Sequence, residues 1–132
     1  MKRQIKFRGK DIKTGYWRYG YYIYDDNYGS HSIYFQKNIL PTINDPIGSH
    51  TIVEREVDPN TVGQYTGFKD SKGKEVYEGD VIKTNNGIGV VYYEDFTWYG
   101  AGDYLHNISE YYPEVEVLGN VYDNPELLDN ID

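Results

Sequence analysis

The 132-residue sequence contains no cysteine and only one methionine. The missing thiols exclude a disulfide framework, a thiolate zinc site, an iron–sulfur site and a cysteine nucleophile. No apolar stretch is long enough to form a transmembrane helix. The basic residues Lys2 and Arg3 are not followed by the apolar segment of a secretory signal, so we expect a cytoplasmic protein with no membrane partner.

The common catalytic signatures are missing as well. The sequence has no Gly-x-Ser-x-Gly elbow, and Gly87-Ile88-Gly89 lacks the third glycine and the following helix of a dinucleotide-binding turn. Adjacent carboxylates such as Asp25-Asp26 carry no meaning for glycoside chemistry without a defined separation. We therefore expect no enzymatic activity, no catalytic residue and no cofactor.

One set of side chains has a spacing that suits a metal ion. Asp103, His106 and Glu110 would share one face of a helix. Gly102 and Pro113 disfavour a helix in this stretch. A metal site needs three or four convergent ligands, so we predict none here.

Aromatic side chains are abundant, with sixteen tyrosines, four phenylalanines and two tryptophans. Aromatic and β-branched residues favour strands. A chain of 132 residues that is 39% hydrophobic can bury one modest core. We predict a mainly β single domain over residues 1–132, with an amino-terminal β lobe at 1–62 and a second lobe at 63–132.

The first lobe is predicted to be an antiparallel meander. Alternating apolar and polar residues indicate strands at 5–8, 16–24 and 31–35. Residues 36–50 show no clear period and are expected to form an irregular loop. The alternation returns in a strand at 51–57.

The second lobe has stronger turn signals. Glycine-bearing turns at 70–73 and 85–87 predict two hairpins. The strands of this lobe are expected at 65–68, 75–77, 81–84, 88–93 and 115–122. Short strands joined by hairpins fit a partly closed, SH3-like barrel over 63–122. Asn124-Pro125-Glu126 predicts a short carboxy-terminal helix with Asn124 as its cap.

Charge is distributed unevenly along the chain, whose net charge is -8. Residues 1–24 hold seven Lys or Arg against one acid, whereas residues after Lys83 include ten acids and no Lys or Arg. The basic segment could neutralise the acidic half within one fold. Alternatively, the opposed charges could support head-to-tail self-association or separate surfaces for two partners.

The basic segment is a candidate nucleic-acid surface, because aromatic rings can stack on bases while cations neutralise phosphates. The alternative is that its rings fill the core and its cations are merely solvated. The candidate residues are Lys6, Arg8, Tyr16, Trp17, Arg18 and Tyr19.

The acidic half is a candidate surface for docking a basic protein. The alternative is a solvated acidic face that serves solubility. The candidate residues are Glu94, Asp95, Glu114 and Glu116.

Three segments form one recognisable set: IKFRGK at 5–10 followed by GYW at 15–17, VGQYTGFKDSKGKEVYEGDVI at 62–82, and VLGNVYDNPELL at 117–128. Together they resemble the YopX family, which consists of small proteins found in bacteriophages and prophages. The resemblance implies a phage or prophage accessory protein of the bacterial cytoplasm. It brings no catalytic residue with it.

These observations favour a non-enzymatic protein-interaction module. Its partner is expected to be a host or phage protein, and exposed strand edges or the opposed charges predict a homo-oligomer. The alternative is a nucleic-acid-binding accessory protein that uses the basic aromatic strands of the first lobe.

Overall fold

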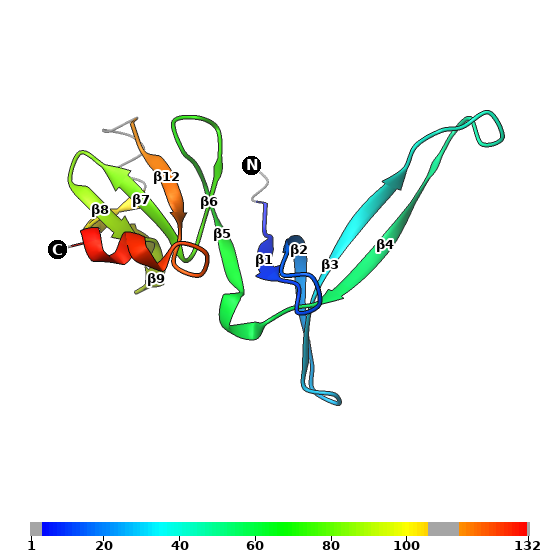
Figure 1. Ribbon diagram of the computed structural model, residues 1–132, viewed down its shortest axis with the longest axis horizontal. Coiled ribbons are helices and arrows are strands. Elements are labelled where there is room, and N and C mark those ends of the chain that lie inside the picture. The colour runs from blue at the N-terminus through cyan, green and yellow to red at the C-terminus, as the bar shows by residue number, and fades with distance from the viewer. Residues whose placement is uncertain (1–3, 106–113, 132) are drawn as a thin grey trace. The chain divides into compact units, whose positions relative to one another are not determined.

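The structure is a computed structural model that describes residues 4–105 and 114–131, shown in Figure 1. The predicted mainly β class is confirmed, and the recorded strand pairings are antiparallel. The chain separates into two compact units, one formed by Lys6–Val62 and the other by Gly63–Asp132 together with the residues before Lys6. Among the described residues, no helix is long and apolar enough to cross a membrane.

The amino-terminal unit is the predicted antiparallel meander. Its strands follow one another in the sheet in the order β4-β3-β2-β1, as the cross-strand pairs show. A short 3-10 helix, η1 (Pro59–Thr61), closes the unit, with the Asp58 side chain accepting a hydrogen bond from the Asn60 amide. The strands are β1 (Phe7–Lys10), β2 (Trp17–Asp25), β3 (Ser30–Ile39) and β4 (Ser49–Glu56).

The prediction of an irregular loop at 36–50 is wrong for much of its length. Strands β3 and β4 pair continuously out to Ile39 and Ser49, so only residues 40–48 lie outside the paired strands, in the loop at the tip of the hairpin. Residues on both faces of this part of the ribbon are exposed. Without a buried face there is no alternation of apolar and polar residues, so the sequence carries no periodic signal there.

Gly20 allows β2 and β3 to lie close together. A Cβ atom at this position would lie 2.1 Å from the carbonyl oxygen of Tyr34. Gly20 also pairs with Phe7 of β1, without a register shift.

The carboxy-terminal unit is built from a hairpin and two three-stranded sheets. Strand β5 pairs with β6, and the sheets have the orders β12-β7-β8 and β11-β10-β9. Neither three-stranded sheet closes on itself within the described residues, and the SH3-like barrel stays a prediction. The strands are β5 (Gly63–Lys69), β6 (Glu75–Tyr77), β7 (Asp80–Thr84), β8 (Gly87–Val90), β9 (Tyr92–Glu94), β10 (Thr97–Gly100), β11 (Asp103–Tyr104) and β12 (Glu116–Asn120).

Both predicted hairpins of this unit are present. In the first, the buried Asp70 accepts hydrogen bonds from the Lys72 and Lys74 amides at 2.9 and 2.8 Å, and Gly73 has a φ of 84°. In the second, Thr84 pairs with Gly87 around the two-residue turn. The Asp70 carboxylate therefore stabilises the first turn through hydrogen bonds from the turn's own backbone amides.

The carboxy-terminal segment forms a 3-10 helix, η2 (Pro125–Asn130). The Asn124 side chain does not cap it, and accepts a hydrogen bond from the Asn120 amide at 3.2 Å instead. Gly119 leaves space for this contact, since a Cβ atom there would lie 2.3 Å from Asn124 Oδ1.

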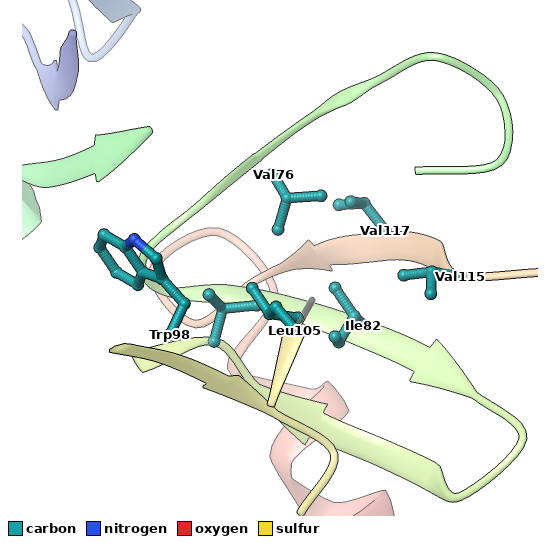
Figure 2. Packing of buried hydrophobic residues seen from close by; sticks show 7 residues of the cluster. Val76, Ile82, Trp98, Leu105, Val115 and Val117 are labelled. Carbon is teal, nitrogen blue, oxygen red and sulfur yellow. The ribbon is translucent and has the colours of Figure 1, made fainter. Parts of the chain in front are cut away.

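The apolar core of this unit joins both three-stranded sheets with the β5–β6 hairpin, as Figure 2 shows. Phe68 packs against its margin. Burial of these branched and aromatic side chains supplies the main stabilising free energy of the unit. The buried members are Val76, Ile82, Val91, Trp98, Leu105, Val115 and Val117.

Candidate functional site

The candidate nucleic-acid residues do not form one surface. In the register of β1 and β2, Arg8 lies opposite Tyr19, and Lys10 opposite Trp17, so these four residues share one face. Arg18 lies opposite Gly9 and therefore belongs to the other face. The half-buried Lys6 precedes β1, and the exposed Tyr16 precedes β2.

The guanidinium groups of Arg8 and Arg18 make contacts within the unit. Arg8 is only 4% exposed, and its guanidinium carbon lies 4.6 Å from the centre of the Trp17 ring. Arg18 places two nitrogens 3.1 Å from a carboxylate oxygen of Asp11. Both cations therefore already have partners, which limits what they can offer to a phosphate.

Asp11 is the centre of an ion-pair cluster. Besides Arg18, its carboxylate lies 3.8 Å from the guanidinium of Arg55 and accepts hydrogen bonds from the Lys13 and Thr14 amides. The bond from the Lys13 amide, aided by those from Arg18 and Thr14, lowers the pKa of Asp11 against the opposing effect of burial. The cluster joins the turn after β1 to β2 and β4.

The rings of β2 do not all fill a core. Tyr19, Tyr21 and Ile23 alternate along one face of the strand, and all three are exposed. Ile52 of β4 belongs to the same face and is also exposed. The opposite face holds Ile33, which is fully buried. One side of this sheet therefore presents apolar surface to solvent.

The tip of the β3–β4 hairpin presents aliphatic side chains that the sequence analysis did not single out. Leu40, Ile43 and Ile47 are 79%, 99% and 90% exposed. Thr42 and Asp45 exchange backbone hydrogen bonds of 2.7 and 3.2 Å, which give the tip a defined turn. The only available sequence signal was an unpatterned stretch with isolated large aliphatic residues.

The candidate acidic residues lie in two places. Glu94 ends β9 and Asp95 follows it in the turn to β10, and both are exposed. Glu116 begins β12 in the other sheet, where its carboxylate binds Lys72 at 2.9 Å. Glu114 is exposed just before β12. Glu94 and Glu116 therefore belong to two different sheets, and Glu116 is already ion-paired.

Of the metal candidate, His106 and Glu110 lie outside the described residues, and Asp103 belongs to β11. Within residues 4–105 and 114–131, no group of three or more His, Asp or Glu side chains gathers in a way that could hold a metal ion.

A cavity of about 660 Å³ lies beside the β7–β8 hairpin. Among its described lining residues Lys83 is the only charged one, and the others include Asn86, Tyr92 and Ala101. No nucleophile paired with a base lines it, so its described wall has no evident catalytic arrangement.

Comparison with known proteins finds solved structures of similar fold and a matching family. A crystal structure of protein EF1440 from Enterococcus faecalis aligns with a TM-score of 0.61 and 21% sequence identity, covering 96% of this chain and 99% of that one. At this identity the likeness concerns the fold alone. No curated protein sequence matches significantly. The family model described as YopX protein matches residues 6–129, which is nearly the whole sequence. The chain therefore belongs to the YopX family.

Proposed function

We propose that this chain is a phage- or prophage-encoded accessory protein of the bacterial cytoplasm that acts by binding another protein and not by catalysis. Membership of the YopX family supports the phage setting. The observation that carries the interaction proposal is the tip of the β3–β4 hairpin, where three aliphatic side chains stand almost fully in water.

The tip has the properties of a protein-binding element. Fully burying a Leu or Ile side chain contributes about 1.5–3 kcal/mol, and that gain is available here only through a partner. The ribbon behind the tip is paired as far as Ile39 and Ser49, so the turn is presented on an ordered support. Asp45 is the only charged residue in 40–48, which disfavours a polyanion as the ligand.

The partner surface expected from this chemistry is an apolar groove on a host or phage protein. A second copy of the chain could supply such a surface, which would give the homo-oligomer expected from the sequence. Strand β4 lies at the edge of its sheet, where a second copy could pair with it. The consecutive charged residues Glu54, Arg55 and Glu56 disfavour such pairing at that end of the strand.

The test is affinity capture from host and phage-infected lysates with three baits. The baits are wild type, the triple variant Leu40→Ser, Ile43→Ser, Ile47→Ser, and the control Tyr28→Ser, which removes an exposed ring from the β2–β3 turn. Wild type and control should recover the same partner, and the triple variant should lose it. Light scattering on the same proteins detects a second copy as the partner. Equal recovery and equal mass for all three baits would contradict the proposal.

The alternative function is nucleic-acid binding by the first two strands. The exposed rings of Tyr16 and Tyr19 favour it, since each offers a face for stacking. The engagement of Arg8 with Trp17 and of Arg18 with Asp11 weighs against it. A salt titration of binding to single- and double-stranded DNA and RNA tests it, and no binding at low salt would eliminate it.

A further inference from the structure

The β11-β10-β9 sheet has one face in the core and one in solvent. Trp98, in the middle of β10, is buried in the core cluster. Its neighbour Tyr99 points to the other face, as alternation along a strand requires. Tyr99 lies opposite Tyr92 of β9 and Tyr104 of β11. Three tyrosines therefore form one row across the outer face of the sheet.

The rings of this row are in contact. Tyr92 and Tyr99 stack with centroids 5.2 Å apart at an interplanar angle of 12°, and Tyr99 and Tyr104 lie 4.9 Å apart at 35°. The two outer rings, Tyr92 and Tyr104, are exposed. A hydrogen bond with Tyr104, followed by burial and the charge of Asp95, raises the pKa of Tyr99 to about 12, so this phenol is neutral at physiological pH.

The surroundings of the row are acidic. Glu94 is two positions from Tyr92 on β9 and pairs with Thr97, two positions from Tyr99, so it belongs to the same face. Asp95 follows in the turn, and both carboxylates are exposed. No Lys or Arg occurs after Lys83 in the sequence. Lys83 itself lines the cavity that Tyr92 also lines, so one cation lies at that end of the row.

The turn beside the row is also unusual. Asp95 and Phe96 have φ angles of 50° and 66°, a conformation that asparagine and glycine adopt easily and phenylalanine does not. Phe96 is 95% exposed, so no packing within the described chain compensates for this backbone conformation. A two-residue hairpin turn requires positive φ at both central residues, so the tight β9–β10 turn itself sets this conformation and leaves the Phe96 ring in solvent.

We propose that the tyrosine row (Tyr92, Tyr99 and Tyr104), with Glu94 and Asp95, binds an extended arginine-rich segment of a partner protein. Guanidinium groups stack on aromatic faces and pair with carboxylates, and the site offers both. The row spans roughly 10 Å, about the length of three residues of a polyproline II segment, which rises about 3.1 Å per residue. Side chains three positions apart lie on the same side of such a segment, so arginines at this spacing match the two exposed ends of the row.

Other ligands fit this surface less well. Nucleic-acid bases could stack on the rings, but their phosphates would meet Glu94 and Asp95. A lysine-rich segment would satisfy the carboxylates but would lack the planar group that stacks on the rings. The inference rests on the proposed function because it supplies the chemistry of a protein partner. It uses residues of the carboxy-terminal unit, whereas Leu40, Ile43 and Ile47 belong to the amino-terminal unit.

The test is a titration of the whole protein, followed by nuclear magnetic resonance, with a synthetic peptide of three Arg-Gly-Gly repeats. Wild type should bind this peptide more tightly than the matching Lys-Gly-Gly peptide, and should not bind an eight-residue thymidine oligonucleotide. Tyr92→Leu should weaken binding of the arginine peptide by about two- to fivefold, whereas Tyr92→Phe, which keeps the ring, should retain it.

Matched carboxylate variants distinguish binding at this site from a general effect of the protein's negative charge. The pair Glu94→Gln with Asp95→Asn should weaken binding about threefold and reduce its salt dependence. The pair Glu126→Gln with Asp129→Asn removes the same charge from η2 and should leave binding unchanged. Equal losses in both pairs, unaltered binding by Tyr92→Leu, or preference for the oligonucleotide would overturn the proposal.

The hairpin-tip variant distinguishes this proposal from the previous one. The triple change at Leu40, Ile43 and Ile47 should leave binding of the arginine peptide unchanged. If peptide binding is lost with that variant as well, the tyrosine row is not the binding site. If peptide binding is normal but lysate capture is insensitive to the tip, the proposed function fails and the present inference stands.

Discussion

The guanidinium of Arg18 lies 3.1 Å from the carboxylate of Asp11, seven residues earlier in the chain. Asp11 also accepts two amide hydrogen bonds from the turn that separates these residues. A cation that the sequence offers for phosphate binding is thus part of the scaffold that joins β1 to β2. This structural role is sufficient to account for a cation beside aromatic residues, and no nucleic-acid ligand is needed to explain it.

Replacing Asp11 should destabilise the amino-terminal unit, and the loss should be larger for alanine than for asparagine. Asp11→Asn keeps an oxygen for the Lys13 and Thr14 amides but removes the charge that holds Arg18, so the melting temperature should fall. Asp11→Ala removes both contributions and should lower it further. Thermal unfolding followed by circular dichroism measures the order, with Asp26→Asn, at an exposed turn position, as the control. An unchanged melting temperature in Asp11→Ala would contradict this role.

Asp70 should make the carboxy-terminal unit sensitive to acid. Burial tends to raise the pKa of Asp70, but hydrogen bonds from the Val117, Lys74 and Lys72 amides outweigh it, so the pKa lies below its usual 3.8. The stability that Asp70 contributes is fully present above its pKa in the unfolded chain. It is lost as the pH falls through the lower pKa of the folded protein. Urea unfolding between pH 7 and pH 2 should show this loss.

The matched variant is Asp70→Asn, which cannot titrate. At pH 7 it should cost about 1–3 kcal/mol, because the Val117 amide loses its charged acceptor. Its stability should also decline less below pH 4 than that of wild type. Asp129→Asn, at an exposed position, should behave like wild type. Parallel pH profiles for Asp70→Asn and wild type would refute the assignment.

The hairpins of the second half could be predicted because their signals are local. Asp70 and Gly73 occupy the positions where a side-chain acceptor and a positive φ define a turn. The pairing of Thr84 with Gly87 likewise follows from the turn residues between them. No knowledge of distant residues is needed for either.

The surfaces could not be predicted in the same way. Whether Tyr21 faces a core or solvent depends on what covers the sheet, and the strand pattern is identical in both cases. The burial of Arg8 depends on its stacking with Trp17, nine positions later in the sequence. The tyrosine row requires the register of three strands, which places Tyr92 opposite Tyr99. Cross-strand register is a tertiary property.

Gly20→Ala should disrupt the pairing of β2 with β3. The added methyl would lie 2.1 Å from the Tyr34 carbonyl oxygen, a separation that requires the strands to move apart. Gly67→Ala is the comparison, because Gly67 has a φ of 88° but open space around its Cα. It should cost about 1 kcal/mol from backbone strain alone. Urea unfolding should show the larger loss for Gly20→Ala, and the reverse order would count against the close approach.

Phe96→Gly should stabilise the β9–β10 hairpin. Glycine adopts the φ of 66° without steric cost, so the free energy of unfolding should rise by roughly 1 kcal/mol. Phe96→Ala keeps the unfavourable conformation and should bring no comparable gain. Thermal unfolding compares the two variants. A lower melting temperature for Phe96→Gly than for wild type would mean that the ring has a structural role in the fold.

The central claim is that the tip of the β3–β4 hairpin binds a partner protein. The most direct measurement is photo-crosslinking in host cells that produce the protein with a benzophenone amino acid at position 43, or at position 28 as the control. We predict a specific covalent adduct of defined mass at position 43, formed with a partner protein or a second copy, and none at position 28. No adduct at position 43, or the same adducts at both positions, would contradict the account.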